Sequence, residues 1–237
     1  MKHKVALLLI AFFVLLFNCT AHVYGIDLGV ETETLSQEKK ETLFASSDIK
    51  LLTEEGIRRS VACFDVNEDG LVAIGFDVSP RPQVYLYDSN GQFLYGYEFE
   101  CMGSYGIKLI GNNLAIYFVR SDYIEIYDAE GNGIDAMRVP NTEANRAWKS
   151  DMIDPVEIEV NGNTYSLERD IGLIMRSYSR LVRLDEQGNR TVLYDVSVRH
   201  NIGVVIGVIL FVGFVSLLTV VLIRQQRDRQ EKDDSAC

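Results

Sequence analysis

The three histidines of this chain lie outside its long central stretch, which limits the chemistry that this stretch can perform. They are His3, His22 and His200, and no histidine lies between the last two. Ser-His-Asp and Cys-His catalysis both need an imidazole as the general base, and most zinc hydrolases bind their metal through histidine. The sequence therefore excludes these chemistries from the central stretch and favours a function other than catalysis.

One acidic segment offers oxygen ligands at alternate positions. Residues 65–70 read Asp-Val-Asn-Glu-Asp-Gly, which matches the first half of a calcium-binding loop with Asp65, Asn67 and Asp69 as the ligands. Phe76 stands where an EF-hand would place its bidentate glutamate, so an EF-hand is excluded. Two interpretations remain, a shorter calcium loop and a hairpin turn without a metal.

Carboxylates are abundant, since 34 Asp and Glu face 23 Lys and Arg and the formal net charge is −11. Two carboxylates on one cleft can hydrolyse a glycosidic bond, so a carboxylate-dependent enzyme acting on glycans or cell walls is an alternative function. The sequence does not show which two carboxylates would share a cleft. Nucleic-acid binding is not expected because the chain is acidic and its central stretch has no cluster of Lys and Arg.

The central stretch contains two cysteines, Cys63 and Cys101. They have neither the CxxC spacing nor the neighbouring histidine of a zinc site. In an oxidising compartment they could form a disulfide, which requires Cα atoms within about 7 Å. A disulfide and two free thiols are both compatible with the sequence.

Both ends of the chain carry an apolar run. Residues 1–25 combine a basic start, a short apolar run and small residues, which is typical of a secretory signal peptide; whether it is cleaved stays open. Residues 202–223 carry no charge, and we predict that they cross a membrane as a helix. Arginines follow at once, so residues 224–237 are predicted to form a short cytoplasmic tail and the central stretch to lie outside the cell.

The central stretch shows the period of two that is typical of β-strands. Residues 26–50 are polar and are expected to form a mobile leader, and residues 51–198 are expected to form the folded domain. Strand-like runs are joined by Asp-x-x-Gly turns at Asp88, Asp128 and Asp185. Each of these hairpins follows a second hairpin with Asn and Gly in its turn, so we expect three units of four strands.

These hairpins resemble the blades of bacterial β-propellers of the NHL and WD-repeat types, over roughly residues 61–196. The resemblance implies an all-β domain of three propeller-like, four-stranded units followed by one C-terminal transmembrane helix. Three blades are fewer than the four to eight that close a ring. The domain is therefore expected to be an open stack, or to be completed by a second copy or another protein at an open sheet edge. The chain as a whole resembles exported membrane proteins of Gram-positive bacteria.

The function expected from these features is binding. We expect an extracellular interaction module of a single-pass membrane protein, with self-association as one way to complete the ring. No cofactor is expected apart from the calcium ion considered above. The alternatives are the carboxylate-dependent exported enzyme and a sensor that passes ligand occupancy to residues 224–237. Many tyrosines lie on the expected strands, either to pack between units or to form a recognition surface.

Overall fold

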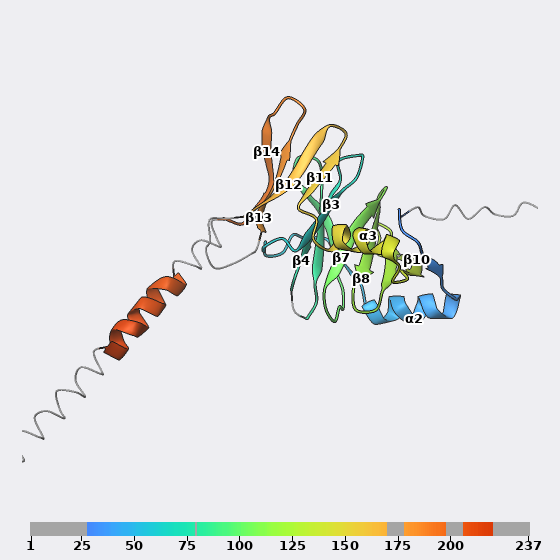
Figure 1. Cartoon of the computed structure of the whole chain (residues 1–237), viewed down its shortest axis with the longest axis horizontal. Helices are drawn as coiled ribbons and strands as arrows, with labels where there is room; N and C mark the ends of the chain where they lie inside the picture. Colours follow the sequence, from blue (N-terminus) through green and yellow to red (C-terminus); the bar gives the residue numbers. More distant parts are fainter. Residues whose placement is uncertain (1–27, 79, 170–177, 198–205, 220–237) are drawn as a thin grey trace, which may run out of the picture.

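The computed structural model describes residues 28–78, 80–169, 178–197 and 206–219 (Figure 1). Its main body consists of three antiparallel sheets, each built from four strands that follow one another along the chain. Unit 1 contains β3 (Cys63–Val66), β4 (Val72–Phe76), β5 (Gln83–Tyr87) and β6 (Phe93–Glu98). Unit 2 contains β7 (Tyr105–Ile110), β8 (Asn113–Phe118), β9 (Tyr123–Tyr127) and β10 (Gly133–Arg138). Unit 3 contains β11 (Glu157–Val160), β12 (Asn163–Arg169), β13 (Tyr178–Leu184) and β14 (Arg190–Asp195). The predicted three units of two hairpins are confirmed.

The last turn of each unit is held by the side chain of its aspartate. Asp88 Oδ1 accepts hydrogen bonds from the backbone N–H groups two and four residues later, at 2.9 and 2.8 Å, and Asp128 and Asp185 do the same in their units. The glycine of each turn has a positive φ of 79°, 86° or 82°, which side chains rarely tolerate. The repeated Asp-x-x-Gly pattern is therefore a turn-forming motif.

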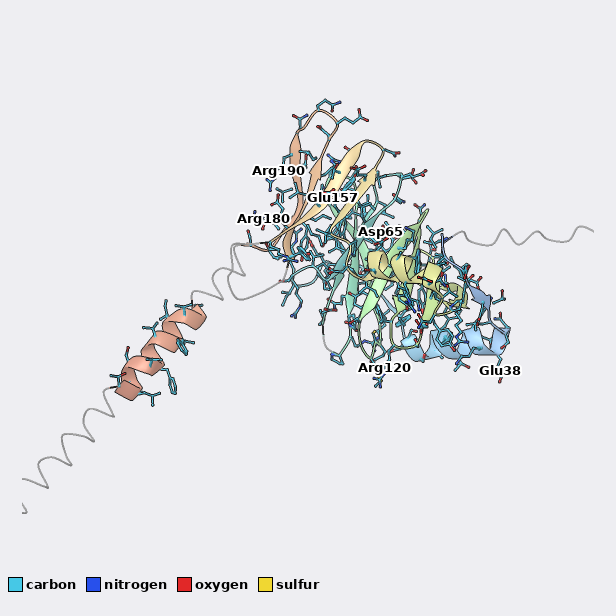
Figure 2. The ribbon with its side chains drawn as sticks, viewed as in Figure 1. Glu38, Asp65, Arg120, Glu157, Arg180 and Arg190 are labelled. Atoms are coloured by element: carbon cyan, nitrogen blue, oxygen red, sulfur yellow. The ribbon has the colours of Figure 1, made fainter. Side chains whose placement is uncertain are left out.

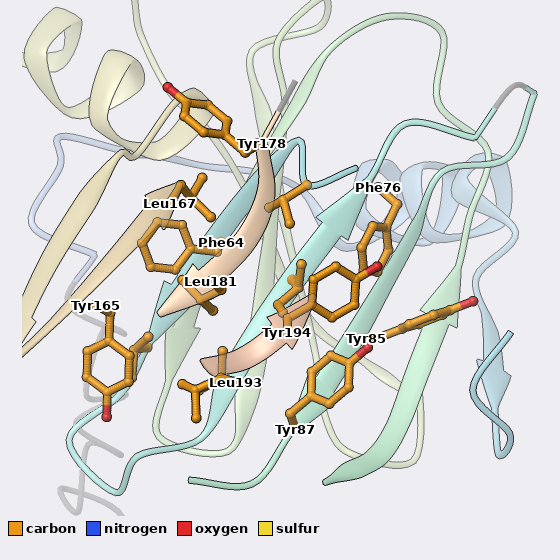
Figure 3. Packing of buried hydrophobic residues seen from close by; sticks show 14 of the residues in the cluster. Phe64, Phe76, Tyr85, Tyr87, Tyr165, Leu167, Tyr178, Leu181, Leu193 and Tyr194 are labelled. Atoms are coloured by element: carbon orange, nitrogen blue, oxygen red, sulfur yellow. The ribbon is translucent and has the colours of Figure 1, made fainter. Parts of the chain in front are cut away.

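The units do not pack in the order in which the chain makes them. One face of unit 1 packs against unit 2 in a core that includes Val84, Leu86 and Ile107. The other face of unit 1 packs against unit 3, and Figure 3 shows Tyr85 and Tyr87 of unit 1 in one cluster with Leu181 and Tyr194 of unit 3. The spatial order is therefore unit 3, unit 1, unit 2. A propeller built in chain order would place unit 3 on the free face of unit 2.

A helix packs on that free face of unit 2. Helix α3 (Glu143–Ile153) begins at Thr142, whose side chain accepts a hydrogen bond from the N–H of Asn145. Met152 of this helix lies in a core cluster with Tyr117 and Ile126 of unit 2. Helix α3 was not predicted from the sequence. A dimer that closes a six-unit ring, one of the expected assemblies, would therefore require α3 to move.

The N-terminal part of the described chain forms a belt over the outer strands of units 1 and 2. This N-terminal belt, residues 28–52, contains β1 (Glu33–Thr34), α2 (Gln37–Ser47) and β2 (Lys50–Leu52). Strand β1 pairs with β10 of unit 2, and β2 pairs with β6 of unit 1, so both sheets gain a fifth strand. The prediction of a mobile polar leader over residues 26–50 was wrong for its described part, because paired edge strands and buried apolar anchors such as Leu43 hold it.

The predicted signal peptide (1–25) and cytoplasmic tail (224–237) lie outside the described residues. Within the predicted span, residues 206–219 form a helix whose large apolar side chains are exposed. No helix within the described residues is long and apolar enough to cross a membrane. Residues 170–177, between β12 and β13, are likewise outside the described residues.

Candidate functional site

A cavity of about 510 Å³ lies where the first strands of the three units meet helix α3. Its apolar wall comes from all of these elements and includes Phe64, Ile107, Trp148, Met152 and Ile158. Its charged lining consists of Asp65, Lys108, Asp151, Asp154 and Glu157. In Figure 2, Asp65 and Glu157 lie close to α3, as their shared place in this lining requires. The cavity exists because unit 3 packs beside unit 1, which brings β11 next to β3.

Asp65 is the buried charge of this cavity. Its side chain is only 8% exposed, and its Oδ2 accepts a hydrogen bond of 2.6 Å from the backbone N–H of Leu109 in unit 2. Burial raises the pKa of the Asp65 carboxyl, and the bond from Leu109 offsets part of this rise. Asp65 therefore joins units 1 and 2 and also places a carboxyl group in the cavity wall.

Replacement of Asp65 tests its bridging role. Asp65→Ala leaves the Leu109 N–H without an acceptor and is expected to lower the free energy of unfolding by about 1–3 kcal/mol. Asp65→Asn keeps an acceptor oxygen and should cost less. Because the folded pKa is raised, the stability contributed by the Asp65 proton is present at low pH and is lost as the pH rises through the folded pKa. Urea unfolding at several pH values should therefore show a weaker pH dependence in Asp65→Asn; an unchanged dependence would contradict this role.

The other three carboxylates of the cavity, Asp151, Asp154 and Glu157, are exposed at its mouth. Among the described residues, none of the three has an ion-pair partner, and Lys108 is the only cation in the lining. Some carboxylates elsewhere on the surface are paired: Arg81, for example, binds those of Asp48, Glu98 and Glu100. The cavity therefore presents an uncompensated negative charge.

Trp148 gives the cavity a fixed aromatic group. Its indole N–H donates a hydrogen bond of 2.8 Å to the carbonyl of Leu28, and its ring lies edge-on to the ring of Tyr117 with centroids 5.7 Å apart. Two contacts on different elements hold the side chain in place. An aromatic surface beside carboxylates can bind cations and flat apolar groups.

Two of the three residues of the predicted calcium loop make other contacts in the structure. Asp65 lines the cavity, whereas the Asn67 carboxamide builds the turn: its oxygen accepts from the N–H groups of Asp69 and Leu71 at 3.1 and 2.9 Å. The Asn67 amide also donates to the carbonyl of Gly111 in unit 2 at 2.8 Å. The described residues contain no group of three or more His, Cys, Asp or Glu side chains placed to hold a metal. A calcium ion here would have to replace these turn bonds.

The two cysteines are free thiols in the structure. Cys63 is fully buried between units 1 and 2, and burial raises the pKa of its thiol. Cys101 is half-buried and its thiol donates a hydrogen bond to the carbonyl of Gly103 at 3.3 Å. Of the disulfide and the two free thiols that the sequence allows, the structure contains the free thiols.

Most residues of the cavity were not predicted from the sequence as site residues. Trp148, Asp151 and Asp154 lie in or directly after α3, between the second and third units, where the strand pattern stops. The available signal was the capping residue Thr142 followed by a helix-forming run. Most tyrosines of the strands pack in the core, and Tyr85, Tyr87 and Tyr97 are at most 1% exposed.

Neither family models nor the sequences of curated proteins match this chain. Two solved structures share some of its arrangement of strands. Sqt1 of Saccharomyces cerevisiae is 14% identical, with 61% of this chain and 34% of that chain covered and a TM-score of 0.27. Streptogramin B lyase is 13% identical, with 63% and 45% covered and a TM-score of 0.26. The chain thus spans less than half the length of either structure.

Proposed function

We propose that this chain is a binding module and that its ligand occupies the cavity between β3, β7, β11 and α3. The ligand we propose is a small cation with a flat apolar part. The observation that carries the proposal is the set of four carboxylates around this cavity, none with an ion-pair partner among the described residues, beside the fixed ring of Trp148. A negatively charged cleft with apolar walls attracts cations and raises their local concentration.

The size and lining of the cavity also support a small ligand. Its volume of about 510 Å³ lies within the range of roughly 300–1,000 Å³ that small-molecule sites occupy. Its lining combines apolar side chains with five charged ones, so that apolar contact and charge can both contribute to binding. The sequence-based prediction that a helix at residues 202–223 anchors the module outside a membrane is part of this proposal.

Binding of 2-phenylethylamine to the full-length chain, measured by calorimetry, tests the proposed ligand class. This probe combines an ammonium group with a flat ring, and phenylacetate offers the same ring with the opposite charge. A fragment of this size is expected to bind with a dissociation constant in roughly the millimolar range. Phenylacetate should not bind, because the carboxylates repel it.

Two variants of strand β11 distinguish binding in the cavity from a general attraction of the cation to the acidic protein. Glu157→Gln should weaken binding of 2-phenylethylamine several-fold, because it removes a carboxylate of the lining. Glu159→Gln changes the same residue type two positions along β11, at an exposed site outside the lining, and should leave the affinity unchanged. Equal effects of both variants, or equal affinity for phenylacetate, would overturn the proposal.

A further inference from the structure

A carboxyl group is buried under the N-terminal belt, and none of its described hydrogen bonds comes from a cation. Glu125 lies on β9 of unit 2 and is only 2% exposed. Its Oε2 accepts hydrogen bonds from two hydroxyl groups, those of Ser47 and Tyr127. Ser47 is the last residue of α2, so this carboxyl group holds the end of that helix against unit 2.

The same end of α2 is also attached to unit 1. The carbonyl of Ser47 accepts a hydrogen bond of 2.7 Å from the N–H of Glu100, just after β6. Phe44 packs its ring edge-on against Tyr127, with centroids 5.6 Å apart. Gly133 gives this ring its space, because a Cβ at that position would lie 2.7 Å from the ring. Ser47 is thus the point where the belt, unit 1 and unit 2 meet.

We propose that Glu125, Ser47 and Tyr127 form a proton-controlled latch for the N-terminal belt. The latch is closed when Glu125 carries a proton and loosens when Glu125 is ionised. A neutral carboxyl group with two hydroxyl partners is stable in an apolar interior, whereas a buried carboxylate without a cation is costly. Loosening would release α2 and, with it, the β1 and β2 strands that cover the outer edges of units 2 and 1.

Among the groups around the latch whose pKa is raised by burial, Glu125 is the first to ionise as the pH rises. The carboxyl group of Asp48, which follows Ser47, is paired with Arg81 and Lys50, and the hydrogen bond from Arg81 lowers its pKa. On α2, Lys40 forms an ion pair with Asp135 of β10 and is therefore engaged elsewhere. From unit 1 the thiol of Cys101 faces this corner, and burial raises the pKa of that thiol. Burial raises the pKa of Tyr127 as well, so this phenol stays protonated while Glu125 ionises.

The direction of the pH effect follows from the burial of Glu125. Burial raises its pKa above the ordinary glutamate value of 4.5, and the hydroxyl bonds of Ser47 and Tyr127 offset part of this rise. The docked state therefore binds the proton more tightly than the released state. The contribution of this proton to the stability of the docked state is complete below the ordinary pKa of glutamate. It decreases as the pH rises through the pKa of Glu125 in the folded protein.

Hydrogen exchange of the α2 amides in the full-length chain, over a series of pH values and corrected for intrinsic rates, tests the latch. Above the folded pKa the opening constant of α2 should rise by up to about tenfold per pH unit, as expected for one linked proton. Glu125→Gln keeps a neutral acceptor and should remove this dependence. Glu41→Gln, an exposed position on the same helix, should keep it.

Single-donor variants keep the test decisive if Glu125→Gln fails to fold. Ser47→Ala and Tyr127→Phe each remove one hydroxyl donor and should speed α2 exchange already at low pH, while exchange in unit 3 stays unchanged. Exchange of α2 that does not vary with pH in the unmodified chain would overturn the proposal. So would the same pH dependence in Glu125→Gln, or unchanged α2 exchange in both single-donor variants.

Discussion

Gly91→Ala is expected to destabilise the protein by about 2–5 kcal/mol. The φ of Gly91 is +79°, and a side chain in this left-handed region costs roughly 1–2 kcal/mol. A Cβ at this position would also lie 2.6 Å from the backbone carbonyl oxygen of Leu193 in unit 3. Because backbone atoms cannot rotate away, this contact adds about 1–3 kcal/mol of overpacking.

The corresponding glycines of the other two units provide matched controls for Gly91. Gly131 and Gly188 occupy the same place in their Asp-x-x-Gly turns with φ of +86° and +82°. A Cβ at Gly188 would meet nothing within 4 Å, and one at Gly131 would meet only side-chain atoms at 3.9 Å or more. Alanine at these two positions should therefore cost only about 1–2 kcal/mol. Equal losses in all three variants, measured by urea unfolding, would contradict the packing of unit 3 on unit 1.

Gly106→Ala is expected to displace α3 and to cost about 3 kcal/mol, the upper part of the range for overpacking. Gly106 lies on β7 at the centre of the contact with α3, and a Cβ there would lie 2.5 Å from the backbone carbonyl oxygen of Met152. Trp148 is the single tryptophan of the chain and lies on this helix, so its fluorescence reports the displacement. Its emission should shift to the red as the ring becomes more exposed to water.

A second glycine next to the same strand serves as the control for Gly106. Gly111 directly follows β7 and has a positive φ of 57°, but a Cβ there would meet nothing within 4 Å. Gly111→Ala should therefore lower stability by about 1–2 kcal/mol without changing the Trp148 emission. A red shift in both variants, or in neither, would contradict the direct contact between β7 and α3.

The strands and their turns were predictable because their signals are local. Alternating apolar residues and the Asp-x-x-Gly turns at Asp88, Asp128 and Asp185 determine each hairpin without help from distant parts of the chain. All three units of two hairpins were therefore predicted. The spatial order of the units was not predictable, because the apolar pattern of a strand does not tell which partner covers a face of its sheet.

The belt was missed for a similar reason. The sequence of α2 is polar overall, with Leu43 as its only fully buried apolar residue, so composition alone suggests a disordered segment. Its order comes from contacts with distant residues, including the ion pair of Lys40 with Asp135 and the bond of Ser47 to Glu125. Contacts of this kind leave no periodic signal in the sequence.

The cavity was only partly predictable. Asp65 was identified as a candidate ligand because it stands in an acidic turn segment, yet its role depends on Leu109 of unit 2 and on the neighbouring β11. Glu157 and Asp154 are brought to the same cavity by the packing of unit 3 beside unit 1. A site assembled from three units and a helix cannot be recognised from residue spacing alone.

Titration of Trp148 fluorescence with 2-phenylethylamine is the most direct test of the proposed binding cavity. Trp148 lines the cavity and is the only tryptophan of the chain, so its emission responds to a ligand bound beside its ring. We predict a saturable change in emission with 2-phenylethylamine, no change with phenylacetate, and a several-fold weaker response in Glu157→Gln. Calorimetric binding of 2-phenylethylamine without any change in Trp148 emission, or no saturable binding at all, would contradict it.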